Sequence, residues 1–176
     1  MDIMGEMHFS KNERSDAMYT DLEYTSLVEE YIDSIFRIAL NYTKESADAE
    51  DITQEVFFKL YRENRYFESR EHCKNWLIRV AINECKKWYR SPGRRHVSLD
   101  AAVASMPQKQ EHKDLVRYVL ALPRKFRLPI YLHYYEGYTT QEIAELLHIP
   151  KGTVCTNLDR GRRMLRLQLK EEEEYA

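Results

Sequence analysis

Apolar residues recur every three or four positions along most of the chain, which is the spacing of one buried helix face. In residues 138–169, Thr139 is placed to cap a helix, and Glu142 three positions later completes a capping box. Pro150 then interrupts the apolar pattern. Because proline suits the first turn of a helix, a second helix is predicted to begin there or at Lys151. This stretch therefore predicts a helix-turn-helix.

The second helix of this pair has two chemically different faces. Val154, Leu158 and Leu165 follow the inward-facing spacing. Short polar and cationic groups, which can meet base edges and phosphates in a major groove, occupy the rest. They are Lys151, Thr153, Cys155, Thr156, Asn157, Arg160, Arg162 and Arg163. An ordinary helical hairpin with a solvated basic side is the alternative interpretation.

Three further helices are predicted in the first half of the chain. The apolar spacing indicates helices over 26–42, over 49–62 with Asp48 as its cap, and over 76–90. Residues 1–22 are polar and acidic without helical periodicity, so we expect a mobile tail there.

The helix over 49–62 carries an unusual outer face opposite its predicted core stripe of Ile52, Val56 and Leu60. Two carboxylates, an amide and an aromatic ring share that face at helical spacing. They are Asp51, Gln54, Glu55 and Phe58. An exposed ring among acids indicates a protein partner, whereas packing of Phe58 against a third helix is the alternative.

The chain becomes basic and aromatic after Tyr61. Rings stack on unpaired bases while cations follow phosphates, so this mixture suits single-stranded DNA. The candidates in and beside the following helix are Tyr66, Phe67, Asn75, Trp76, Arg79, Asn83, Lys86, Lys87 and Arg90. A merely solvated basic face, with the tryptophans in the core, is the alternative.

These patterns predict an all-α protein with two small helical domains, 23–91 and 111–170. A flexible linker is expected over 92–110, because Pro92 and Gly93 stop the preceding helix and no apolar face follows. The second domain is predicted to have four helices, and the acidic residues 171–176 to form a fraying tail.

Charge is distributed unevenly behind a formal net charge of −2 over 176 residues. Residues 1–61 hold 5 Lys and Arg against 14 Asp and Glu, whereas residues 62–95 hold 10 against 4 and residues 148–170 hold 6 against 1. Binding to a polyanion depends on the local patch, so both basic segments are compatible with nucleic acid.

Few other residues in the sequence indicate a metal site, a disulfide or a catalytic centre. Three cysteines without a CxxC pair fit reduced thiols in the cytoplasm, and no apolar run predicts a signal peptide or membrane insertion. His72, Cys73 and Cys85 lack two further ligands for a metal site. Since no catalytic or cofactor-binding motif is present, we expect neither an enzyme nor a cofactor.

Three segments in this order resemble the extracytoplasmic-function (ECF) type of bacterial RNA polymerase sigma factor. They are AEDITQEVFFKLYR at 49–62, NWLIRVAINECKKWYR at 75–90 and YTTQEIAELLHIPKGTVCTNLDRGRRMLR at 138–166. The resemblance covers about residues 24–168.

The resemblance implies a partner for each surface. Asp51, Gln54, Glu55 and Phe58 would dock on the clamp coiled coil of core RNA polymerase. Tyr66, Phe67, Asn75 and Trp76 would surround an extruded base of the minus-ten element, with Arg79, Asn83, Lys86, Lys87 and Arg90 on adjacent DNA. The helix from Lys151 would enter the major groove of the minus-thirty-five element in promoter DNA. An anti-sigma factor would occupy these surfaces in the inhibited state.

The chain departs from the family where bases would be contacted. Pro150 stands where a serine cap is common, and Cys155, Thr156 and Asn157 stand where lysine, serine and arginine are common. The base preference of relatives therefore does not transfer, and Arg160, Arg162 and Arg163 are expected to carry more of the phosphate contact.

Two other classes of protein compete with this interpretation. One is a stand-alone helix-turn-helix regulator that never joins polymerase, and the other is an enzyme or a metal-binding helical protein. The acidic and aromatic face around Phe58 favours a polymerase subunit over the stand-alone regulator, and stoichiometric zinc in the purified protein would favour the metal-binding class.

Overall fold

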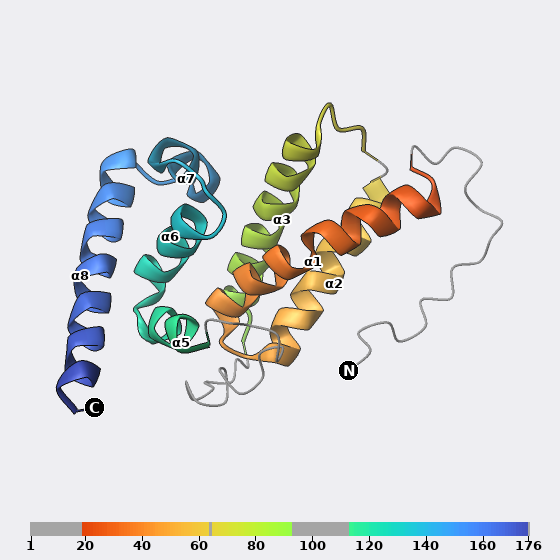
Figure 1. Ribbon diagram of the computed structural model, residues 1–176. Coiled ribbons are helices and arrows are strands. Elements are labelled where there is room, and N and C mark those ends of the chain that lie inside the picture. The colour runs from red at the N-terminus through yellow and green to blue at the C-terminus, as the bar shows by residue number, and fades with distance from the viewer. Residues whose placement is uncertain (1–18, 64, 93–112, 176) are drawn as a thin grey trace.

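The computed structural model describes residues 19–63, 65–92 and 113–175. These residues form seven helices and no strand. Two groups of helices are evident, α1 to α3 in the first half of the chain and α5 to α8 in the second (Figure 1). The predicted all-α class with two helical domains is thus confirmed. The linker expected over 92–110 lies almost entirely outside the described residues, as do residues 1–18 of the predicted N-terminal tail.

The first group comprises α1 (Asp21–Thr43), α2 (Ser46–Glu63) and α3 (Arg70–Arg90), each in contact with the other two. All three predicted core positions of α2 are buried. Phe57 joins them in the core, and its carbonyl oxygen accepts a hydrogen bond of 2.9 Å from the Tyr24 hydroxyl of α1. The side chains that fill the centre of this group are Ile35, Ile38, Leu40, Val56, Leu60, Leu77, Ile78 and Ile82.

The predicted starts of α1 and α3 were wrong by five and six residues. α1 begins at Asp21 because Thr20 and Glu23 form a capping box, which stabilises a first turn that lacks the apolar pattern. α3 begins at Arg70 because the Ser69 hydroxyl accepts a hydrogen bond of 3.0 Å from the His72 amide. Asn75, which precedes the predicted helix over 76–90, is therefore on a helix.

Two other predicted boundaries also differ from the structure. Asp48 does not cap α2, because the helix begins two residues earlier and places this carboxylate inside the first turn. There it still complements the positive end of the helix dipole. α8 (Lys151–Tyr175) continues through the acidic residues 171–174, which were expected to form a separate tail.

The second group comprises α5 (Lys113–Ala121), α6 (Arg124–Tyr134), α7 (Thr140–Leu147) and α8. The predicted capping box at the start of α7 is present, with the Thr139 hydroxyl accepting from the Glu142 amide. α7 ends at Leu147, and the next residue, His148, adopts the left-handed conformation. The turn then leads into α8 at Lys151, as predicted. The two helices thus form the predicted helix-turn-helix.

The two groups pack against each other, which the sequence did not predict. α1 contacts α6, and α3 contacts α7. Figure 1 shows α8 on the outer side of the second group, away from α3. Two helices of the second group, α6 and α7, therefore face the first domain, while its last helix, α8, faces away from it.

Candidate polymerase and nucleic-acid interfaces

The acidic and aromatic face of α2 is open to solvent. Asp51 and Gln54 are exposed, Glu55 is half-buried, and the Phe58 ring is 49% exposed. The Arg62 guanidinium lies 5.7 Å from the centre of that ring. Packing of Phe58 against a third helix, the alternative considered from the sequence, is therefore wrong. The structure brings the four predicted residues together on one exposed surface. No described helix covers the Phe58 ring on that surface.

Aromatic rings gather where the chain enters α3. Phe67 is largely buried, with its ring centre 5.6 Å from that of Trp76 and 5.5 Å from that of His72. Tyr66 beside it is 64% exposed. Because Phe67 packs inward, we expect it to support Trp76 rather than present an open face to a base. Tyr66 and the half-buried Trp76 are the rings of this set that solvent reaches.

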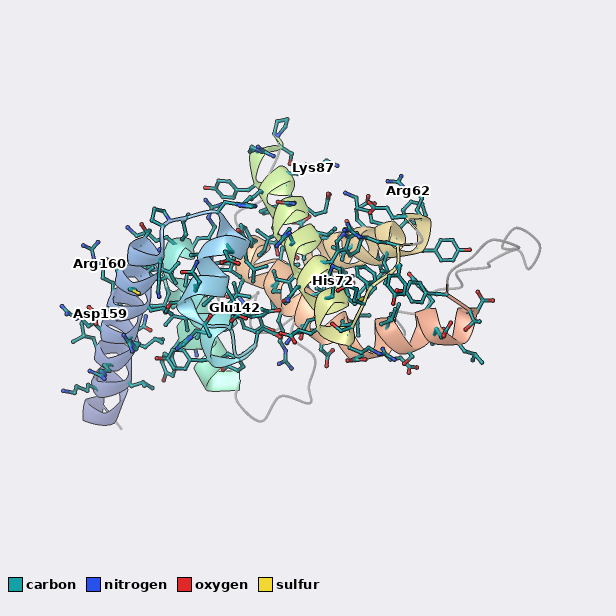
Figure 2. The ribbon with its side chains drawn as sticks, turned by 90° about the horizontal axis from the view of Figure 1, so that it is seen from above. Arg62, His72, Lys87, Glu142, Asp159 and Arg160 are labelled. Atoms are coloured by element: carbon teal, nitrogen blue, oxygen red, sulfur yellow. The ribbon has the colours of Figure 1, made fainter. Side chains whose placement is uncertain are left out.

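The cationic stripe of α3 is exposed over most of its length. Arg79, Asn83, Lys87 and Arg90 are exposed, and Lys86 is half-buried. The stripe lies opposite the buried line of Leu77, Ala81 and Cys85, as the helical spacing predicted. Figure 2 shows Lys87 near the end of α3 on this outer side. The predicted stripe is thus a continuous surface.

The outer face of α8 is the most open of the candidate surfaces. Asn157 is half-buried, and the other candidates are exposed. They are Lys151, Thr153, Cys155, Thr156, Arg160, Arg162 and Arg163. Arg163 pairs with Asp159 at 2.9 Å, and Figure 2 shows Asp159 and Arg160 on the side of α8 away from α3. Val154 and Leu158 are buried on the opposite face.

Gly161 holds α8 close to α6, a role that the sequence analysis missed. A Cβ atom at this position would lie 3.1 Å from Cγ1 of Ile130 and 3.3 Å from Cβ of Phe126. The missing side chain therefore allows the two helices to approach. A lone glycine inside a helical pattern was the available signal.

The second domain covers the start of α3, and this contact was also missed. The Tyr138 hydroxyl donates a hydrogen bond of 2.5 Å to Oδ1 of Asn75, and the Lys74 ammonium lies 2.8 Å from the carboxylate of Glu136. Farther along α3, Lys86 donates to the carbonyl oxygen of Leu147 at 3.4 Å. No periodic pattern identifies such polar contacts between residues about 60 positions apart.

Glu136 is ionised at this junction. Burial alone would raise the pKa of its carboxyl, but hydrogen bonds from Lys74, Tyr131 and Ser34 outweigh burial and lower the pKa from its ordinary value of 4.5. Burial raises the pKa of the Tyr131 and Tyr138 hydroxyls, and the negative charge of Glu136 raises it further.

The cysteines do not form a metal centre in the described part of the chain. Cys73 and Cys85 are buried in the core of the first domain, and burial raises the pKa of both thiols, that of Cys73 to about 11. Among the described residues, no three His, Cys, Asp or Glu side chains are placed to hold a metal ion. No described helix is both long and apolar enough to cross a membrane.

Comparison with known families gives two matches that follow the two helix groups. Residues 27–95 match Sigma-70 region 2, and residues 112–165 match Sigma-70 region 4. The first match contains the α2 and α3 faces, and the second contains the helix-turn-helix. The alternative of an ordinary helical hairpin is therefore not supported.

Two solved structures share the fold at low sequence identity. The sigma factor RpoE of Bartonella quintana, solved with the anti-sigma factor NepR, aligns with a TM-score of 0.64 at 19% identity, covering 84% of this chain and 96% of that chain. CnrH, solved with the cytosolic domain of CnrY, aligns with a TM-score of 0.62 at 20% identity, covering 88% and 92%.

Sequence relatives extend the match across both domains. The ECF RNA polymerase sigma factor SigW of Bacillus subtilis is 30% identical over 168 residues, covering 84% of this chain and 89% of SigW. The ECF RNA polymerase sigma-E factor of Escherichia coli K12 is 29% identical over 161 residues, covering 81% and 84%. With both sigma regions present in order and a relative of this similarity over nearly its full length, the chain belongs to the ECF RNA polymerase sigma factors.

Proposed function

We propose that this chain is a promoter-specificity subunit that joins core RNA polymerase, acts in the cytoplasm and has no catalytic activity of its own. The observation that carries this proposal is the exposed face of Asp51, Gln54, Glu55 and Phe58 on α2, which is separate from both basic surfaces. An exposed ring among acids suits a protein partner, and cationic faces suit DNA.

The two basic surfaces take different forms of promoter DNA. Tyr66 and Trp76 at the start of α3, together with Asn75, bind an extruded base of the minus-ten element, and Phe67 supports Trp76 from beneath. Arg79, Asn83, Lys86, Lys87 and Arg90 hold the adjacent strand. Flipping a base costs a few kcal/mol, which stacking and pocket contacts must offset.

α8 enters the major groove of the minus-thirty-five element. Thr153, Cys155, Thr156 and Asn157 face base edges, and Lys151, Arg160, Arg162 and Arg163 contact phosphates. Cys155 and Thr156 favour apolar or single hydrogen-bond contacts over the bidentate guanine contact typical of arginine, so we expect a base preference unlike that of relatives.

Run-off transcription on a randomised promoter library, with core polymerase and the purified chain, tests this function. We expect selected promoters with two conserved elements and no transcripts from core alone. Gel filtration with core supplies the second arm, because Phe58→Ala should reduce co-elution while the wild type co-elutes. Failure of the wild type to co-elute, where a control sigma factor does, would instead identify a stand-alone regulator.

An anti-sigma factor is the further partner that we propose. RpoE was solved with the anti-sigma factor NepR and CnrH with the cytosolic domain of CnrY, and the α2 and α3 faces here leave aromatic and cationic groups exposed. Affinity purification from the native cell, with and without envelope stress, should recover an inhibitor in unstressed cells. Recovery of polymerase alone in both conditions would remove this partner.

A further inference from the structure

Tyr19 lies directly before the first helix of the chain, and the backbone there has a fixed direction. The next residue, Thr20, caps α1: its hydroxyl accepts a hydrogen bond of 3.2 Å from the Glu23 amide, and the Glu23 carboxylate accepts one of 2.8 Å from the Thr20 amide. Because both bonds close on the residue that follows Tyr19, they hold the chain in one direction at this point. The half-buried Tyr19 side chain is therefore aimed by the start of α1.

Tyr19 contacts the loop over 65–69, which leads into α3 and lies close to the start of α1 (Figure 1). Its ring centre is 6.5 Å from that of Phe67, with 25° between the two ring planes, a separation at which aromatic rings attract each other. The Tyr19 hydroxyl also shares a hydrogen bond with the Phe67 backbone. Burial raises the pKa of this hydroxyl, as does the nearby Cys73 of α3, whereas the bond to Phe67 lowers it. One side chain thus holds Phe67 both by its ring and by its backbone.

Phe67 in turn neighbours the two rings that solvent reaches at this surface. Its ring centre is 5.6 Å from that of the half-buried Trp76, and the residue before it, Tyr66, is 64% exposed. A shift of Phe67 therefore moves Tyr66 through the backbone and removes the packing behind Trp76. The placement of both rings depends on where Phe67 is held.

α1 also holds the chain where the loop enters α3. The Tyr31 hydroxyl donates a hydrogen bond of 3.1 Å to the carbonyl oxygen of Arg70, and the Arg70 guanidinium lies 2.7 Å from the Glu30 carboxylate. Loss of the Tyr19 side chain would leave these contacts in place. It would therefore release only the end of the loop that carries Tyr66.

We propose that Tyr19 is a positioning residue for the minus-ten element: by holding Phe67, it sets the placement of the two rings beside it and so determines which extruded base they accept. This rests on the proposed function of α3. Rings that are fixed before the base arrives discriminate between bases by shape, whereas rings on a released loop adapt to any base. Tyr19 precedes the segment 27–95 that matches Sigma-70 region 2, so its contact is additional to the matched region.

The first test measures base discrimination by run-off transcription with core polymerase and the full-length chain. Each of the four bases is placed in turn at every minus-ten position of a promoter selected with the wild type. Tyr19→Ala should lower the ratio of transcript from the preferred base to transcript from the other bases about five- to tenfold, the effect of about one stacking or hydrogen-bonding contact. Tyr19→Phe keeps the ring and loses only the hydroxyl, so we expect a smaller loss. Unchanged discrimination in Tyr19→Ala would overturn the proposal.

Two controls separate positioning from a general defect of the fold. Leu22→Ala is the matched variant, because that side chain is 84% exposed in the first turn of α1, and it should discriminate as the wild type does. Base discrimination at the minus-thirty-five element should stay unchanged in Tyr19→Ala. Equal loss at both elements would also overturn the proposal.

The second test needs neither polymerase nor DNA. The chain has two tryptophans, so Trp88→Phe leaves Trp76 as the source of tryptophan fluorescence. In this background we expect stronger acrylamide quenching after Tyr19→Ala, because Phe67 then packs less firmly against Trp76, and no change after Leu22→Ala. Equal quenching with and without Tyr19→Ala would show that Tyr19 does not hold the loop.

These outcomes separate the positioning role from the proposed function. Specific run-off transcripts together with unchanged discrimination in Tyr19→Ala would remove the positioning role alone. Absence of transcripts from the wild-type chain with core polymerase would remove the function, and Trp76 quenching would still decide whether Tyr19 holds the loop.

Discussion

Asn83 is exposed on α3 between Arg79 and Lys87, on the surface proposed for the melted strand. Asn83→Ala removes an amide without disturbing the buried side of the helix, so we expect it to weaken the open complex by about 1–2 kcal/mol. Closed-complex binding should change less, because duplex DNA there offers no unpaired base. Permanganate reactivity of unpaired thymines and gel mobility of closed complexes measure the two states. Equal loss in both would contradict the assignment.

The carboxylate of Glu136 makes the domain contact dependent on pH. Because its pKa is lowered in the closed arrangement, its contribution is complete above the ordinary value of 4.5 and is lost as pH falls through the lowered pKa. Lys74, Tyr131 and Ser34 hydrogen-bond to this carboxylate, and Arg37 carries a positive charge near Tyr131.

We therefore expect energy transfer between one dye on the exposed Cys155 and a second on Glu29→Cys of α1 to stay constant from neutral pH down to about 5 and then to fall under acid. Glu136→Gln should show lower transfer at neutral pH and little further change on acidification. A wild-type chain that keeps its neutral-pH transfer at pH values well below 4 would show that Glu136 does not hold the contact.

At the scale of the elements, Gly161 allows α6 and α8 to approach each other closely. Gly161→Val adds atoms where a Cβ already meets Ile130 at 3.1 Å, so we expect the free energy of unfolding to fall by about 1–3 kcal/mol. Gly152→Ala on the same helix is the control. No atom lies within 4 Å of a Cβ there, and alanine should leave stability unchanged or raise it by up to about 1 kcal/mol. Denaturant unfolding followed by circular dichroism compares them.

Element types were predictable because each buried stripe repeats at helical spacing, as Ile52, Val56 and Leu60 do in α2. Boundaries failed where a cap rather than an apolar residue begins the helix. Thr20 and Glu23 repeat the spacing of Thr139 and Glu142, yet α1 was predicted to start later because residues 1–22 lack helical periodicity. In the structure, Leu22 in the first turn is exposed and adds nothing to the buried stripe.

The candidate surfaces were predictable to the extent that one helix carries each of them. Faces of α2, α3 and α8 emerged from spacing alone, since residues at i and i+4 must share a side. The inward packing of Phe67 and the pairing of Glu136 with Lys74 depend on how separate elements come together. Polar contacts of that kind leave no periodic signal in the chain.

At the scale of the whole molecule, a buried guanidinium lies on α6, which packs against α1 of the first domain. Arg127 on α6 is only 4% exposed, and its Nε and Nη1 atoms have no hydrogen-bond partner among the described residues. Burial, with a smaller effect from Arg124, lowers the pKa of Arg127 to about 10. Burial, with a smaller effect from the charge of Arg127, lowers the pKa of Lys44 at the end of α1. The buried charge of Arg127 thus destabilises the packing of the two domains.

Arg127→Met keeps an unbranched side chain and removes the buried charge, so we expect thermal stability to rise and the free energy of unfolding to increase by about 1–4 kcal/mol. Arg124→Met is the control. The Arg124 guanidinium is exposed and lies 3.7 Å from the ring centre of Tyr89, so its loss should leave stability unchanged or slightly lower. A lower melting temperature for Arg127→Met would show that the Arg127 guanidinium makes stabilising hydrogen bonds in solution.

α8 faces solvent in the same arrangement in which Asn75 and Lys74 are covered. This difference in exposure determines which contact with DNA can form first. Contact with the upstream promoter element needs no change of shape, whereas capture of the downstream strand must wait until the domains part. Recognition of a promoter would then precede its melting as a consequence of which surface is reachable first, and a chain that meets DNA before polymerase would leave the double helix closed.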